Sequence, residues 1–217
     1  MKIPVSVLYE DFLETIESET LALKTVFLAR KSLYKYLKNA ITRFNTCKKN
    51  ITIEGNIFGD GEINVGDNTF IINENCPIKP YIEVYYIIED KGIITLENIK
   101  DYEITEIEDG KFSVVLKENA KHVIYVDYFL DGELVVDSDE GLTLLERRII
   151  VEGMVLEWLS PQINREDNLK QRVANKEFKK LSNATMLNSL VSMDKHRKEE
   201  YKNLLIQYSY RNFKGFN

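Results

Sequence analysis

The protein has 217 residues, of which 44% are hydrophobic and 29% are charged. This balance excludes wholesale disorder, a collagen-like chain and a disulfide-stapled miniprotein, and it allows one or two domains with a buried core. No apolar run reaches the ~18 residues of a membrane-spanning helix, and the start of the sequence lacks the apolar core of a secretory signal. Cys47 and Cys76 are expected to be free thiols in a reducing compartment.

The formal net charge of −6 is unevenly distributed along the chain. Residues 1–49 contain 9 basic and 5 acidic residues, residues 50–140 contain 6 and 21, and residues 141–217 contain 14 and 9. An acidic middle between two basic ends indicates an inserted unit with a surface of its own. The basic residues are too dispersed for sequence-specific DNA binding, which concentrates them on one face.

The first third of the sequence has the period of α-helix. Ser6 is expected to cap a short helix that ends near Glu17. A longer amphipathic helix is expected from Thr20 to Thr46, followed by basic residues that suit a helix C-terminus. Its apolar stripe consists of Leu23, Phe27, Tyr34, Leu37, Ile41 and Phe44.

The middle third changes to the two-residue alternation of β-strands. Strands are predicted at residues 51–58, 62–65, 69–72, 81–88, 111–116, 122–130 and 133–136. Turns are predicted at Gly59-Asp60-Gly61, Gly66-Asp67-Asn68 and Asp109-Gly110, and Asp131-Gly132 is predicted to form a hairpin between the last two strands. Short strands at this spacing are typical of a small antiparallel sandwich or barrel.

The last third returns to helical periodicity. Thr143 and Glu146 match a capping box, and the following IIVEGMVLEWL is apolar around most of a helix, which predicts a buried position. Ser160-Pro161 is predicted to end this helix. Two more helices are predicted, from after Asn164 to Asn175 and from Ala184 to Tyr210. The charged run at 194–200 is interpreted as a solvated face, with a contact surface as the alternative.

Together these patterns predict an α+β fold in which N- and C-terminal helices form a bundle with an inserted small antiparallel β domain. The predicted domains are the N-terminal helices (1–49), the acidic β insertion (50–140) and the C-terminal helices with a tail (141–217). The residues predicted to form the bundle core and subunit packing are Leu23, Phe27, Leu37, Ile41, Ile150, Val151, Met154, Val155, Trp158, Leu204 and Leu205.

The sequence contains no motif that indicates catalysis or metal binding. His122 and His196 lack a second histidine or cysteine at ligand spacing and a recognisable nucleophile. The acidic loops that begin at Asp60 and Asp137 lack the glycine and glutamate positions of a calcium loop. Aromatic residues in the β segment could stack on sugars, but alternating aromatics more often form core and cross-strand pairs. We therefore expect no catalytic residues, no metal and no cofactor.

Two segments of the last third, IIVEGMVLEWLSPQINREDNLKQRVANKEFKKLSNATMLNSL and EEYKNLLIQYSYRN, carry a more specific signal. Residues 149–212 resemble the head-to-tail connector (adaptor or neck ring) proteins of tailed bacteriophages, including podovirus-like and crAss-like phages. The resemblance implies a virion protein, assembled in the host cytoplasm, that forms a ring, usually twelvefold, beneath the portal protein. Such a ring extends the DNA channel and provides a docking platform for tail or further neck proteins.

Under this interpretation the protein has no enzymatic activity, no membrane contact and no contact with DNA beyond its passage through the channel. The acidic β unit is expected to face solvent or a basic partner at the periphery, or to line the channel, where negative walls keep DNA from adhering. The tail at 207–217 is predicted to bind the portal, and a frayed end that packs on its own bundle is the alternative. The predicted portal-binding residues are Tyr208, Tyr210, Arg211, Phe213, Lys214 and Phe216.

Two functions of other classes remain open from the sequence. A β-sandwich binding module with helical tethers would present an aromatic patch to its ligand and would be a monomer in solution. An unrecognised cytoplasmic hydrolase would contain a pocket with paired carboxylates.

Overall fold

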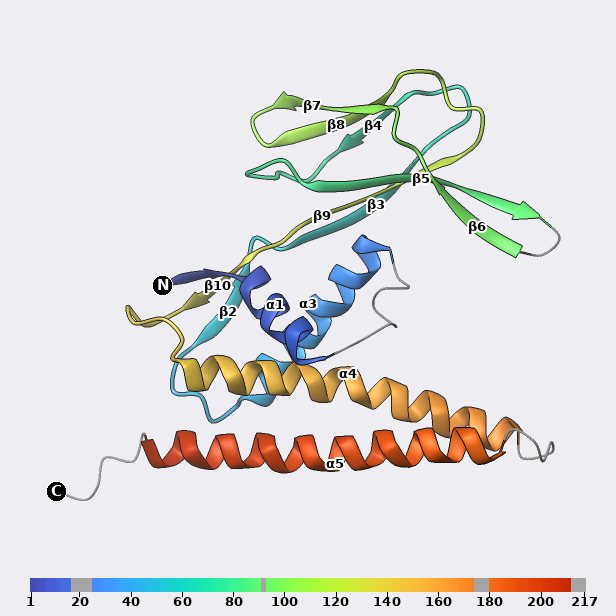
Figure 1. Ribbon diagram of the computed structural model, residues 1–217. Coiled ribbons are helices and arrows are strands. Elements are labelled where there is room, and N and C mark those ends of the chain that lie inside the picture. Colours follow the sequence, from blue (N-terminus) through green and yellow to red (C-terminus); the bar gives the residue numbers. More distant parts are fainter. Residues whose placement is uncertain (17–24, 91–92, 174–179, 212–217) are drawn as a thin grey trace. The chain divides into compact units, whose positions relative to one another are not determined.

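A computed structural model describes residues 1–16, 25–90, 93–173 and 180–211. Over these residues the chain is an α+β protein in which helices from both ends of the sequence pack together and antiparallel sheets form from its middle, as the sequence predicts (Figure 1). The chain divides into two compact units. Unit 1 comprises residues 1–20, 32–52 and 134–217, and unit 2 comprises residues 21–31 and 53–133.

This division differs from the predicted domains at the start of the long helix α3 (Val26–Arg43), since residues 21–31 belong to the β unit. The backbone N–H groups of Val26 and Phe27 donate hydrogen bonds of 3.0 and 3.2 Å to the Glu83 carboxylate. The Phe27 ring also contacts the Phe58 ring edge to face, with a centroid distance of 6.0 Å. A capping carboxylate and an aromatic pair therefore attach the first turns of α3 to the β unit.

Helix α1 (Val5–Thr15) begins one residue earlier than its predicted cap. The short strand β1 (Lys2–Pro4) precedes it, and Pro4 occupies the N-cap position with no side-chain hydrogen bond. The predicted capping role of Ser6 is therefore wrong, because proline already supplies the restricted φ at the helix entrance. The predicted start of the second helix, residues 20–24, lies outside the described residues.

Helix α4 (Leu144–Val173) passes through Pro161 without ending, so the predicted stop at Ser160-Pro161 is wrong. A proline removes one backbone donor, and its ring crowds the carbonyl one turn earlier. The Gln162 side chain donates a 3.3 Å hydrogen bond to the Trp158 carbonyl, next to this defect. The separate helix predicted after Asn164 is the second half of α4, and α5 (Lys180–Arg211) follows.

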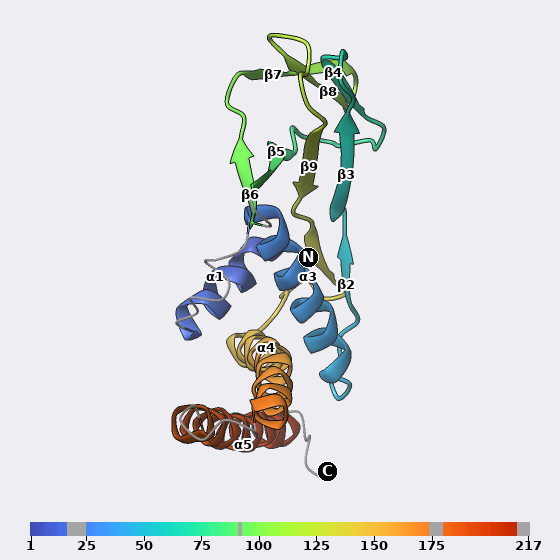
Figure 2. The ribbon, with the colours of Figure 1, turned by 90° about the vertical axis from the view of Figure 1, so that its right-hand side faces the viewer.

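Unit 1 is organised around the first half of α4. Figures 1 and 2 both show α4 and α5 side by side, and α1 and α3 pack on other sides of α4. A Cβ atom added at Gly153 would lie only 2.9 Å from the Cβ of Ala40, so glycine allows α3 to approach closely. Nearly every residue from Ile149 to Leu159 is buried as a result, which confirms the buried position predicted from the apolar circumference.

Strand β1 forms a small sheet with β10 (Glu133–Val136) and β2 (Ile51–Glu54), in the order β1-β10-β2. It anchors the start of the chain, since the N-terminal amine donates hydrogen bonds of 2.7 and 3.2 Å to the carbonyl oxygens of Val136 and Ser138. Residues that are distant in sequence are thereby joined at the entrance to α1.

Unit 2 consists of two antiparallel sheets that share one core. The first has the order β3-β9-β5-β6, with strands Ile57–Ile63, Ile124–Leu130, Tyr81–Asp90 and Ile93–Asn98. The second has the order β4-β8-β7, with strands Thr69–Ile72, Lys111–Leu116 and Tyr102–Glu108. Side chains from both sheets form the core: Ile63, Ile72, Ile82, Val84, Phe112, Val114, Leu116, Ile124, Val126 and Tyr128. Of the two predicted arrangements, sandwich or barrel, the sandwich is present, with β6 and β7 as additional strands.

The predicted turn at Gly59-Asp60-Gly61 is wrong, because these residues lie inside β3. A Cβ atom at Gly59 would overlap the Tyr128 ring, and one at Gly61 would overlap the Phe70 ring. The glycines therefore provide flat backbone on which two aromatic rings rest within a strand. In contrast, Gly66 and Gly110 occupy turns with φ angles of +94° and +76°, as predicted.

Asp131-Gly132 joins β9 to β10 but does not form the predicted hairpin. Strand β9 pairs with β3 and β5, whereas β10 pairs with β1 and β2. The favoured two-residue hairpins require a positive φ angle, and Gly132 does not have one. The Gly132 N–H donates a 3.0 Å hydrogen bond to Asn56 Oδ1. A Cβ atom at Gly132 would overlap the carbonyl oxygen of Glu54 and lie 2.7 Å from the Asn56 nitrogen. Close backbone approach is therefore the reason for glycine here.

We expect Gly132→Ala to destabilise unit 2 by about 2–4 kcal/mol, because rigid backbone atoms have to separate to admit the methyl group. Urea unfolding monitored by fluorescence measures the loss. Gly66→Ala is the comparison variant, because open space surrounds its added Cβ and only the positive φ is unfavourable. It should cost about 1 kcal/mol. Equal losses in the two variants would contradict the close-approach explanation.

Candidate functional site

The Glu146 carboxylate at the start of α4 accepts hydrogen bonds from three segments of unit 1. The backbone N–H and the hydroxyl of Thr143 donate to Glu146 Oε2 at 2.7 and 2.9 Å. The Glu146 N–H donates to the Thr143 hydroxyl at 3.3 Å. These reciprocal bonds confirm the capping box predicted from the sequence.

The same carboxylate is only 2% exposed and also binds two distant segments. Lys49 Nζ lies 2.7 Å from Glu146 Oε2 and donates a second 2.7 Å hydrogen bond to the Gly141 carbonyl. The Tyr208 hydroxyl donates to Glu146 Oε1 at 3.3 Å. We call Lys49, Thr143, Glu146 and Tyr208 the Glu146 cluster. It joins the segment after α3, the start of α4 and the end of α5.

Tyr208 is held on several sides within unit 1. Its ring contacts Phe44 edge to face, with a centroid distance of 5.0 Å, and its hydroxyl accepts a 3.1 Å hydrogen bond from the Lys48 N–H. Burial raises the pKa of Tyr208 to about 12, so it stays protonated and can donate to Glu146. Burial of Glu146 would raise its pKa, but the hydrogen bonds from Lys49 and Thr143 outweigh this effect and hold the pKa below its ordinary value.

A second buried carboxylate, Glu152, connects α4 to α5. Arg197 Nη1 lies 2.9 Å from Glu152 Oε1 and 3.6 Å from Glu200 Oε2, and Arg148 pairs with Glu200 at 2.8 Å. Desolvation raises the pKa of Glu152 despite the nearby Arg197, and its Oε2 atom is buried without a hydrogen bond. The network places arginines and carboxylates at the contact between the two long helices.

The charged run at 194–200 is thus divided between two environments. Arg197 and Glu200 pack against α4, which agrees with the contact-surface interpretation, although the contact is within the chain. The remaining basic residues of the run, together with His196 and Glu199, are exposed.

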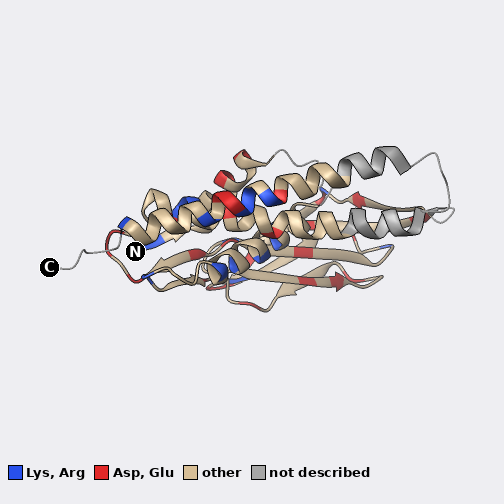
Figure 3. Ribbon diagram, turned by 90° about the horizontal axis from the view of Figure 1, so that it is seen from below, with Lys and Arg blue, Asp and Glu red and all other residues tan. Residues whose placement is uncertain are grey.

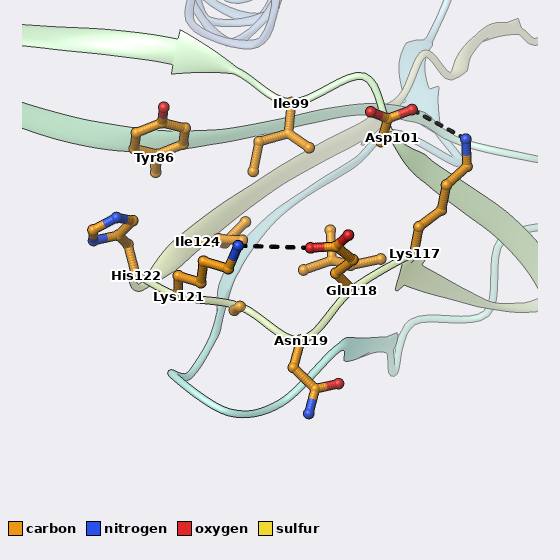
Figure 4. A pocket seen from close by; sticks show the side chains of 11 residues that line it. Tyr86, Ile99, Asp101, Lys117, Glu118, Asn119, Lys121, His122 and Ile124 are labelled. Atoms are coloured by element: carbon orange, nitrogen blue, oxygen red, sulfur yellow. Dashed lines mark hydrogen bonds and ion pairs between the residues drawn. The ribbon is translucent and has the colours of Figure 1, made fainter.

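Unit 2 contains a hollow of about 550 Å³ beside β5, β8 and β9 (Figure 4). The rings of Tyr86 and His122 are nearly parallel at its edge, with an interplanar angle of 16° and a centroid distance of 5.7 Å. Its apolar lining consists of Ile99, Leu116, Ala120 and Ile124. Two ion pairs cross its rim, Lys117–Asp101 at 3.0 Å and Lys121–Glu118 at 3.7 Å.

The lining of this hollow combines apolar side chains with paired charges. Lys117 pairs with Asp101 and Lys121 with Glu118, and the lining includes no serine, threonine or cysteine. The Tyr86 ring and the apolar lining could receive an amphipathic group such as one face of a sugar. In the parts of the chain that the structure describes, no three His, Cys, Asp or Glu side chains are grouped closely enough to hold a metal ion.

The predicted portal-binding residues differ in their exposure to solvent. Tyr208 is buried in the Glu146 cluster, so the alternative in which the first turn of the tail packs on its own bundle describes this residue. Tyr210 is 76% exposed and Arg211 is also exposed. Phe213, Lys214 and Phe216 lie outside the described residues. An anchored tyrosine is therefore followed within three residues by an exposed aromatic and an exposed basic side chain.

A shallow hollow of about 360 Å³ lies next to this end of α5. It is lined by Lys202, Leu205, Ile206, Ser209 and Tyr210. Ile206 is exposed and Leu205 is half-buried, so the outer side of the helix has apolar character as well as the side that faces α4.

Most residues predicted for the bundle core are buried, but not all. The buried ones are Phe27, Leu37, Ile150, Val151, Met154, Val155, Trp158 and Leu204, of which Phe27 lies in unit 2. Ile41 and Leu205 are half-buried, and Leu23 lies outside the described residues. Sequence spacing could not indicate the Lys49–Glu146 pair, because the two residues are 97 positions apart.

Across the described ranges, no helix combines the length and the apolar character that a membrane crossing requires. Comparisons with models of known protein families and with curated proteins find no match to this chain.

We expect Lys49→Met to destabilise unit 1 by about 2–4 kcal/mol, because it leaves the buried Glu146 carboxylate without its cationic partner. Chemical denaturation at neutral pH measures the change. Adding Glu146→Gln to Lys49→Met should recover part of the loss, because the uncompensated charge is removed. Strictly additive effects of the two substitutions would contradict direct coupling between these groups.

The direction in which pH changes the stability contributed by Glu146 follows from its lowered pKa. Since folding lowers the pKa of Glu146, its contribution to stability is complete above the unfolded value of about 4.3 and is lost as the pH falls through the folded pKa. The loss of stability caused by Glu146→Gln should therefore be largest near neutral pH and should shrink below about pH 4. The exposed Glu199→Gln is the matched control, and a pH-independent effect of Glu146→Gln would be inconsistent with this assignment.

Proposed function

We propose that this protein is a structural component of a tailed-bacteriophage neck, a head-to-tail adaptor that forms a ring, usually twelvefold, beneath the portal protein. In this role it extends the DNA channel and provides the platform on which tail or further neck proteins dock. The proposal rests on the resemblance of residues 149–212 to such adaptors. It also agrees with the helical unit, in which the buried charged groups Glu146 and Glu152 join one helical segment to another.

The observation that carries the portal contact is the end of α5. Tyr208 is fixed by Phe44 and Glu146, while Tyr210 and Arg211 extend into solvent from the same helical turn. Aromatic and arginine side chains dominate the energetics of protein interfaces. An anchored helix end also loses little conformational entropy when it binds. Under this proposal Tyr210, Arg211 and the tail beyond them contact the portal, and Tyr208 supports them.

The rest of the proposal follows from this structural role. The protein acts in the virion, after assembly in the host cytoplasm, without enzymatic activity, metal or cofactor. DNA passes through the ring without sequence-specific contacts, and the acidic residues of unit 2 face solvent, a basic partner or the channel.

A β-sandwich binding module is the second candidate, and the hollow beside Tyr86 and His122 favours it. It would require a monomer that binds a ligand, for example an oligosaccharide, through the Tyr86 ring. Retained binding in Tyr86→Ala would exclude this site.

Deleting residues 211–217, or substituting Tyr210→Ala, should weaken capture by purified cognate portal at least about tenfold while the fold is retained. Binding is measured by surface plasmon resonance and folding by circular dichroism. Val191→Ser is the matched control, because it removes an exposed apolar side chain of α5 nineteen residues before Tyr210. If the truncated chain binds portal as tightly as the full chain, the tail is not the anchor.

A further inference from the structure

Part of the four-stranded sheet of unit 2 extends beyond its neighbours. Strand β5 pairs with β9 only over Tyr81–Tyr86, and it pairs with β6 over Tyr85–Asp90. Residues 87–90 and 93–96 therefore pair only with each other, and we call them the arm. Figure 1 shows the arm projecting from the rest of its sheet.

The arm carries aliphatic side chains that unit 2 does not bury. Ile87 lies opposite Leu96, and Glu89 lies opposite Ile94, so these four side chains share one face of the ribbon. Ile87, Leu96 and Ile94 are 44%, 47% and 68% exposed, and Ile93 on the opposite face is 65% exposed. A two-stranded ribbon is only marginally stable in water, and an apolar edge strand tends to pair with another chain. Burial of these side chains therefore requires a surface from outside unit 2.

Charge distinguishes between the surfaces that could cover the arm. Unit 2 contains 9 basic and 18 acidic residues, whereas unit 1 contains 20 basic and 17 acidic residues. Figure 3 shows acidic residues along the strands, and basic as well as acidic residues on the helices. A second acidic unit would repel the arm, which presents Glu89, and a basic helical surface would attract it.

The hollow on the outer side of α5 has the complementary character. Leu205 and Ile206 supply apolar surface, and the Lys202 ammonium group borders it. An apolar ribbon with a carboxylate therefore matches an apolar hollow with a lysine.

We propose that the arm of one copy docks on the α5 hollow of a neighbouring copy, with Ile94 and Leu96 against Leu205 and Ile206 and with Glu89 facing Lys202. The occupant is a second copy of this chain, and the inference rests on the proposed ring. The two surfaces are different patches, so the contact is heterologous, the type that generates closed rings. It deepens the proposed function by assigning the subunit contact to the arm and to Lys202, Leu205 and Ile206, while Tyr210 and Arg211 at the end of the same helix contact the portal.

A charge-reversal cycle tests the contact. Self-association is measured by sedimentation velocity at low salt for Glu89→Lys, Lys202→Glu and the double variant. Each single reversal should weaken the association constant about threefold to fivefold, and the double variant should recover most of the loss. Ile94→Ser should weaken it about tenfold, because an aliphatic anchor is lost. Glu103→Lys and Ile107→Ser are matched controls on β7, outside the arm, and should leave association unchanged.

The same variants are also compared in complex with portal, by cross-linking and mass analysis of the bound rings, so that a wild-type chain that is monomeric alone remains informative. Unchanged association of Glu89→Lys and Ile94→Ser in both settings overturns the arm contact, even where wild-type portal capture is intact. If these variants lose portal capture but keep self-association, the arm binds portal and the second copy is the wrong occupant. A wild-type chain that neither self-associates nor captures portal overturns the arm contact and the proposed function together.

Discussion

The helical unit depends on the ion pair between Lys49 and Glu146. Lys49 precedes the inserted β unit in sequence, and Glu146 follows it, so their 2.7 Å contact closes the helical unit around the insertion. Closing so long a loop costs conformational entropy, and a buried charge pair with satisfied hydrogen bonds can offset part of that cost. Because the Tyr208 hydroxyl donates to the same carboxylate, the pair also holds the end of α5 in position.

The arrangement of α4 follows from this fixed starting point. With its first turn held by Thr143 and Glu146, the next turns are enclosed by α1, α3 and α5. The pairing of Glu152 with Arg197 then sets how α4 and α5 align, because a buried carboxylate is stable only where a cation lies beside it. The helical frame therefore holds the end of α5 in one position, as the proposed portal contact requires.

The β unit follows a different physical principle. Its core depends on aromatic rings that rest on glycine backbone in β3, while the arm leaves aliphatic side chains outside any core. The helical unit and the β unit therefore both have apolar surface that faces outward, with opposite charge around it. In an assembly of identical chains, such complementary surfaces can cover each other, which links the proposed subunit contact to the proposed ring.

The features that depend on neighbouring residues could be predicted from the sequence. These are the fold class, the capping box at Thr143, the turns at Gly66 and Gly110 and the buried first half of α4, since capping, positive φ angles and periodicity are local properties. Tertiary structure alone decided the features that depend on distant partners. Gly59 lies in a strand because a ring from β9 covers it, and Glu146 is a junction because Lys49 and Tyr208 reach it from far along the chain. Spacing in the sequence carries no record of such contacts, because packing brings the partners together.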